Sequence, residues 1–166
     1  MALTYELIAT QTTGGSSIAF TSIPSTYTDL ILVQQHRNDS QATDTDGFFR
    51  FNSDTGATNT YQDVNAGVGA YNTPWSAIMW FADAHSGSQT STIVFQIFNY
   101  ASTTMGKTFL QNCGYDSTHQ MQLGYWDNNS AITRIDSFSA DRWRGQGSPD
   151  NFNANCTFSL YGIKEA

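Results

Sequence analysis

The chain has 166 residues, of which 14% are aromatic and only 13% are charged, against roughly 25% charged residues in an average globular domain. Disordered segments usually show the reverse balance, so we expect a folded domain with a polar but mostly uncharged surface. The net charge is −7 and the only lysines are Lys107 and Lys164, so we expect neither nucleic acid nor an anionic membrane surface as a partner.

Apolar residues recur mainly at every second position, which is the period of a β-strand, and no segment predicts a helix. In chain order the expected strands are Tyr5–Gln11, Ser16–Ser22, Asp29–Arg37, Gly47–Ser53, Trp75–Ala82, Ser91–Asn99, Lys107–Tyr115, Met121–Asp127, Ala131–Ser139 and Asn155–Ile163. Turn signals separate them about every 8–12 residues, which is typical of a sandwich or barrel. We predict a single all-β domain over residues 1–166, an antiparallel β-sandwich of jelly-roll type with about ten short strands.

Three of these segments are apolar at both odd and even positions: Leu30–Val33, Ser76–Phe81 and Ile93–Phe98. A strand of an isolated two-sheet sandwich should instead carry polar residues on its outer face. Something must therefore cover the second face of these strands, and the two alternatives are a long loop of the same chain or another subunit.

The two cysteines, Cys113 and Cys156, are too few for the disulfide framework of a small secreted protein. Cys156 shares its parity with Phe158 and Leu160, which predicts that its side chain points into the core. We expect two reduced core cysteines, with a disulfide bridge or a ligand pair as the less favoured alternatives.

The residues that usually carry chemistry are scattered. His36, His85 and His119 lie far apart, without the clustered Cys or His of a zinc site, and no nucleophile elbow or phosphate-binding loop is present. Asp44 and Asp46 precede Gly47 like the start of a calcium loop, but the later Glu of such a loop is missing, so we favour a polar turn there. The sequence predicts no enzyme activity, no cofactor and no metal.

The densest cluster of charge and aromatic surface is Arg142, Trp143 and Arg144. Trp and Arg are enriched among the residues that dominate binding at protein interfaces, and an exposed Trp can also stack on a sugar ring. The alternative is a core Trp flanked by two Arg in local ion pairs. We take these three residues, together with Trp75 and Trp80, as the candidate interface residues.

The opening Tyr5–Thr10, the segment Ile18–Leu30 and the closing Phe158–Ile163 together resemble a family of β-sandwich domains in virion proteins of tailed bacteriophages, including cyanophages. Phe51–Gly56 and Ile97–Tyr100 are similar to that family as well. The segment 60–90 departs from its pattern. Members resemble parts of tail fibres and capsid decoration proteins, and the family has no catalytic motif.

The resemblance implies a role in the virion. The first strand is expected as early as Tyr5, without the attachment region of a tail fibre or a secretory signal peptide. We therefore expect a capsid decoration (cement) protein, made in the host cytoplasm, that bridges subunits of the major capsid protein as a homotrimer. The alternative is a tail-fibre tip or baseplate domain that binds host surface glycan.

Overall fold

The computed structural model describes residues 3–37, 45–56, 59–63, 69–75, 77–80, 90–115, 118–141, 152 and 155–165. Within these ranges the chain forms β-strands and turns, and no helix long and apolar enough to cross a membrane is found there. The twelve strands are β1 (Leu3–Thr13), β2 (Ser17–Phe20), β3 (Asp29–His36), β4 (Thr45–Phe51), β5 (Asn59–Asp63), β6 (Gly69–Trp75), β7 (Ile78–Trp80), β8 (Ser91–Ile97), β9 (Lys107–Tyr115), β10 (Thr118–Trp126), β11 (Ile135–Asp141) and β12 (Cys156–Glu165).

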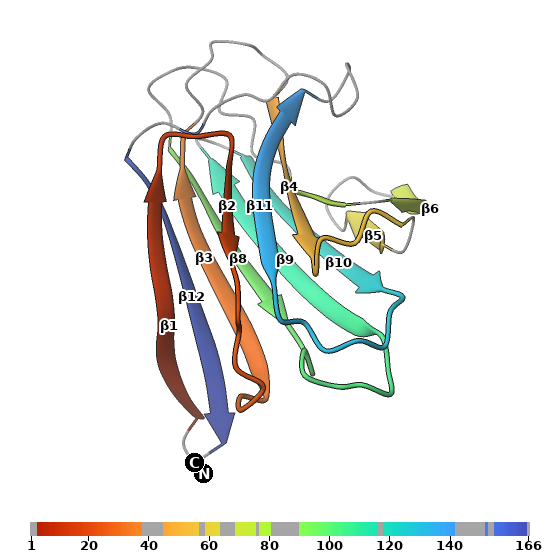
Figure 1. Cartoon of the computed structure of the whole chain (residues 1–166). Helices are drawn as coiled ribbons and strands as arrows, with labels where there is room; N and C mark the ends of the chain where they lie inside the picture. The colour runs from red at the N-terminus through yellow and green to blue at the C-terminus, as the bar shows by residue number, and fades with distance from the viewer. Residues whose placement is uncertain are drawn as a thin grey trace.

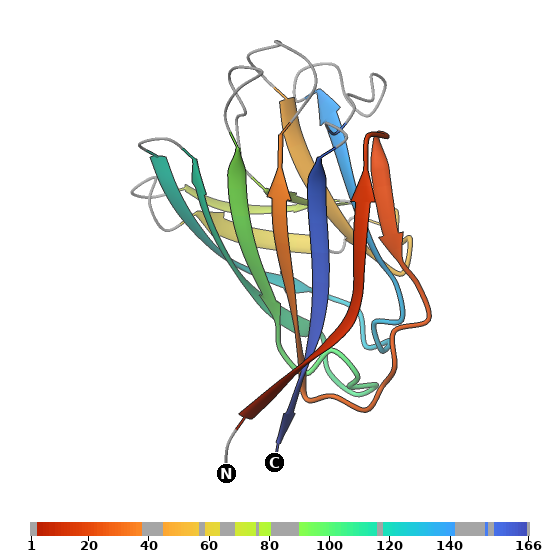
Figure 2. The same ribbon diagram turned by 90° about the vertical axis from the view of Figure 1, so that its left-hand side faces the viewer.

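The strands form two antiparallel sheets that pack face to face (Figure 1). The large sheet has eight strands in the order β1-β12-β3-β8-β9-β10-β5-β6, and the small sheet has four in the order β2-β11-β4-β7. The first and last strands are neighbours, because Leu3 pairs with Glu165 and Thr13 with Cys156, so both chain ends lie at the same end of the sandwich (Figure 2). The predicted antiparallel β-sandwich of jelly-roll type is confirmed.

Alternation along the strands builds the core between the sheets. In β8, Ile93, Phe95 and Ile97 are fully buried, while Val94 between them is 40% exposed. Phe49 of the small sheet stacks on Phe95 of the large sheet, with ring centroids 4.5 Å apart. This aromatic contact joins the two layers, because both rings lie at buried positions of their strands.

The number of strands differs from the prediction of about ten, because β5 and β6 were not expected. Their sequences, NTYQD and GAYNTPW, lack the apolar alternation that marks a half-buried strand. Pro74 in β6 would also argue against a central strand, but β6 is the edge of the large sheet, where proline is tolerated. The strand expected over Trp75–Ala82 is described only as the short β7, Ile78–Trp80, in the small sheet.

Both cysteines are buried thiols, as predicted. The Sγ of Cys156 accepts a hydrogen bond from the Arg37 backbone amide at 3.1 Å and lies 3.2 Å from the Arg37 carbonyl oxygen, to which the thiol donates. Cys156 points inward with Phe158 and Leu160, which confirms the parity read from the sequence.

Candidate interaction surface

Apolar side chains gather on the outer face of the large sheet, the face turned away from the small sheet. We call this group the outer patch. Its members come from six neighbouring strands and are Leu7, Ile31, Val33, Val94, Leu110, Met121, Leu123, Tyr125 and Tyr161. The most exposed are Leu7 at 57%, Leu123 at 52% and Val94 at 40%.

The strand register places these side chains in rows across the sheet. One row runs from Leu7 through Tyr161 to Ile31, and it continues through Gln96 and Leu110 to Leu123. The next row contains Ser159, Val33, Val94, Asn112 and Met121. Neither row contains Lys, Arg, Asp or Glu, although the chain has a net charge of −7. The outer patch is therefore apolar and uncharged at its centre.

Strand β10 shows most clearly that this outer face is an apolar surface. Its apolar residues Met121, Leu123 and Tyr125 alternate, which would ordinarily predict that they face the core. They are instead 37–52% exposed, whereas the residues between them face the core. Gly124 fixes this orientation: a Cβ atom there would lie 2.0 Å from the Phe109 ring, which occupies the inner face.

The structure tests the coverage of the second face of the apolar strands at Val94. A folded-over loop would bury this side chain, and it is 40% exposed. Ile31 and Val33 on the adjacent strand are half-buried. The outer face of β3 and β8 is therefore open at Val94, and its coverage by a partner subunit stays a prediction.

The predicted interface residues are not placed by the structure. Arg142, Trp143 and Arg144 lie outside the described residues. Trp75 ends β6 and Trp80 ends β7, but only their backbones are described, so the two are not shown to share a site. Sequence reasoning singled out tryptophan and arginine and missed the outer patch, apart from the two-sided apolar pattern of β3 and β8.

The structure also does not place the side chains of the two candidate metal ligands, Asp44 and Asp46. Asp44 lies outside the described residues, and Asp46 is described only by its backbone, which pairs with Ala140 in the small sheet. Across the described part of the chain, no group of three or more His, Cys, Asp or Glu side chains could hold a metal ion.

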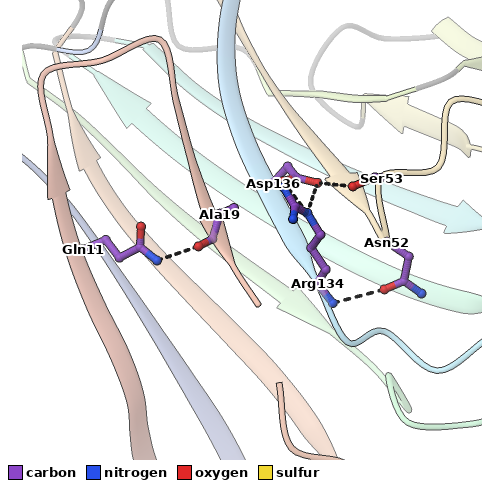
Figure 3. Close-up of polar contacts among 6 residues, drawn as sticks. All are labelled: Gln11, Ala19, Asn52, Ser53, Arg134 and Asp136. Atoms are coloured by element: carbon purple, nitrogen blue, oxygen red, sulfur yellow. Dashed lines mark hydrogen bonds and ion pairs between the residues drawn. The ribbon is translucent and has the colours of Figure 1, made fainter. Parts of the chain in front are cut away.

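The segment Phe51–Gly56 shapes one end of the sandwich. Asn52, which has a positive φ of 50°, accepts a hydrogen bond at its Oδ1 from the backbone amide of Thr133 at 2.9 Å. The same oxygen accepts a second hydrogen bond from the backbone amide of Arg134 at 3.1 Å (Figure 3). Its Nδ2 donates to the Ala131 carbonyl at 2.8 Å. One side chain thus ties the turn after β4 to the loop before β11.

Further polar contacts connect side chains at the same end of the sandwich. The Arg134 guanidinium bonds both carboxylate oxygens of Asp136, at 2.8 and 3.0 Å from Nε, and this pairing raises the pKa of Arg134 (Figure 3). The Asp54 carboxylate accepts the indole N–H of Trp126 at 2.9 Å. These contacts join protein groups to one another, which indicates that the segment organises loops.

The segment Ile97–Tyr100 has a comparable role. The Asn99 backbone amide donates to the Asp29 carboxylate at 2.9 Å, and Asn99 has a positive φ of 50°. The buried Tyr100 hydroxyl donates to the Pro24 carbonyl, and burial raises the pKa of Tyr100. These two of the five segments on which the sequence resemblance rests therefore stabilise turns of the fold.

Lys107 is buried at the same end, which the sequence did not reveal. Its Nζ donates to the carbonyls of Met105 at 2.8 Å and Asn128 at 3.2 Å, and it lies 5.6 Å from the centre of the Trp126 ring. Burial lowers the pKa of this amine. Its neighbours are loop carbonyls, so its contacts join two loops.

No protein-family model matches this chain, and no curated protein matches it. Among solved structures, one similar chain is the alginate lyase Aly36B, a double mutant in complex with an alginate tetrasaccharide. The identity is 14% and the TM-score is 0.41, over 99% of this chain and 74% of the lyase chain.

This comparison contradicts the prediction that the chain is not an enzyme, because the similar structure is a lyase. We withdraw that prediction. A likeness at 14% identity transfers no catalytic residue, substrate or cofactor from the lyase to this chain.

Proposed function

We propose that this protein is a structural component of a tailed-phage virion, a capsid decoration protein that binds neighbouring subunits through the outer patch. The observation that carries the proposal is the uncharged, apolar outer face of the large sheet, with Leu7 and Leu123 more than half exposed on it. Charged residues are depleted at the centres of protein interfaces, and such a face loses little solvation when a partner covers it. The sequence resemblance to phage virion domains supplies the biological setting.

The geometry suits a clamp between capsid subunits. The outer patch crosses six strands, a broad and nearly continuous face for a partner subunit. A standard protein interface buries about 1,600 Å² in total, and repeated copies in a homotrimer would multiply weak contacts by avidity. The net charge of −7 would then keep decorated particles from associating with one another.

A second candidate function is recognition of host surface glycan by a tail-fibre tip or baseplate domain. The observation in its favour is that Tyr5 and Tyr125 are 59% and 38% exposed. Aromatic rings at a surface can stack on sugar rings, as the sequence led us to expect for Trp143.

Phage particles with and without this protein distinguish the two functions. A decoration protein predicts that particles lacking it break at lower temperature or under milder salt stress, while adsorption to host cells is unchanged. If adsorption collapses and the shells remain equally robust, the decoration proposal is wrong and the glycan-binding function replaces it.

A further inference from the structure

Two glutamine side chains lie in the core directly opposite each other. Gln111 on β9 pairs with Gln122 on β10, and both are 0% exposed. Gln111 alternates with the buried residues Phe109 and Cys113, and Gln122 shares the inner face with Trp126. Both amide groups therefore point into the space between the two sheets.

Neither amide has a hydrogen-bond partner among the residues that the structure describes. The unpartnered atoms are the Nε2 and Oε1 of both glutamines, and the Nε2 of Gln34 and the Oγ of Ser91 are buried without partners as well. Native proteins pair nearly all buried polar atoms with protein groups, ordered water or ligand. Four unpartnered amide atoms on two directly paired residues therefore offer hydrogen bonds to a bound molecule.

One polar contact in this core joins the two sheets. The Ser137 hydroxyl of the small sheet donates to the Oε1 of Gln34 on the large sheet at 3.2 Å, within the core. This bond shows that polar side chains from the two sheets meet in the interior. Gln111 and Gln122 lie on the same inner face but two and three strands away from Gln34.

The two amide groups determine which kind of chemical group can bind to them. Each glutamine offers two N–H donors and one carbonyl acceptor and carries no charge. A group that both donates and accepts satisfies them, and a hydroxyl does so in the smallest volume. We propose that Gln111 and Gln122 form a buried binding site for hydroxyl groups, supplied either by enclosed water or by a saccharide. The proposal is independent of the role of the outer patch.

The test uses the full chain, the variants Gln111→Met, Gln122→Met and their combination, and Gln35→Met as the control, since Gln35 is exposed on β3. Magnetic relaxation dispersion of ¹⁷O-labelled water counts long-lived internal water. Thermal unfolding with and without glucose, galactose and N-acetylglucosamine reports saccharide binding.

Two results support the site, and they distinguish water from a saccharide as its ligand. If water fills it, the wild type and Gln35→Met show long-lived water that the double variant loses, and the sugars do not change Tm. If a saccharide fills it, one of the sugars raises the Tm of the wild type and the control but not of the double variant.

The proposal is overturned if the wild type shows neither signal while the double variant is as stable as the wild type. Should the double variant fail to fold, a high-resolution crystal structure of the wild type decides. Water or sugar oxygen within hydrogen-bond distance of both amides supports the site, and amides bonded only to protein atoms refute it.

Discussion

Val33 on β3 and Val94 on β8 stand opposite each other on the outer face of the large sheet, with Val94 40% exposed to solvent. Cross-strand pairs of β-branched side chains stabilise a sheet by packing against each other. No other part of the described chain covers this pair enough to bury it. The pair marks the centre of the outer patch and gives the most direct point for testing it.

We expect Val94→Arg to abolish assembly while the fold is retained. A guanidinium in the middle of an uncharged interface would have to lose its water without gaining a partner, which is costly. Because Val94 is already exposed, its replacement should change the free energy of unfolding by less than about 1 kcal/mol. Sedimentation velocity of the purified protein measures oligomer formation, and co-sedimentation with phage particles measures binding.

The matched control is Thr103→Arg, which adds the same charge at an exposed turn away from the outer patch. It should assemble and bind like the wild type. Equal assembly of the wild type and both variants would show that the outer patch is not an interface. A wild type that remains monomeric at micromolar concentration and forms no trimer on the particle would refute the homotrimer.

Trp126→Phe should destabilise the fold by about 1–3 kcal/mol, because the Asp54 carboxylate loses the indole N–H that it accepts at 2.9 Å. Urea unfolding followed by circular dichroism measures the loss. With Asp54→Ala as the second mutation, the double variant should lose less than the sum of the two single variants. Additive losses would mean that the bond contributes nothing.

Gly124→Ala should destabilise the protein by about 1–3 kcal/mol through overpacking, since the added methyl group would lie 2.0 Å from the Phe109 ring. Thermal unfolding measures the effect. Combining it with Phe109→Leu removes the ring, so the alanine should cost much less in that background. An equal cost in both backgrounds would contradict the packing of this ring over β10.

The exposed ion pair between Glu6 and Lys164, 3.1 Å apart, should give a small pH-dependent contribution to stability. The hydrogen bond from Lys164 lowers the pKa of Glu6 below its usual value of 4.5. A lowered carboxyl pKa contributes stability above the unfolded-state value, and this contribution is lost as the pH falls through the folded-state value. The stability difference between wild type and Glu6→Gln should therefore be present at pH 7 and disappear in acid, and 1 M salt should reduce it. A difference that is unchanged between pH 7 and strong acid would contradict the pairing.

Much of the fold could be predicted because period-two alternation decides which side chains are buried. Phe49 and Phe51, and Cys156 with Phe158 and Leu160, all point inward as their parity indicates. The two unexpected strands β5 and β6 are polar and lie at one edge of the large sheet, where hydrogen bonding to a neighbour, rather than burial, forms the strand. Period-two alternation of apolar residues therefore does not predict such polar edge strands.

The candidate site was harder to predict, because β10 reverses the usual relation between alternation and burial. Met121 and Leu123 face outward and Gln122 faces the core, so only the three-dimensional contact of Gly124 with Phe109 reveals the orientation. The emphasis on Trp143 and its flanking arginines followed residue frequencies at interfaces, which say nothing about where a side chain lies. The absence of catalytic motifs likewise gave a prediction about activity that the comparison with a lyase contradicts.

The most direct test of the central claim is a cryo-electron microscopy map of purified phage particles that contain this protein. The proposal predicts hundreds of copies on the shell, with the outer patch around Val33 and Val94 buried against a neighbouring subunit. A few copies confined to the tail, or shell-bound copies whose outer patch faces solvent, would contradict it.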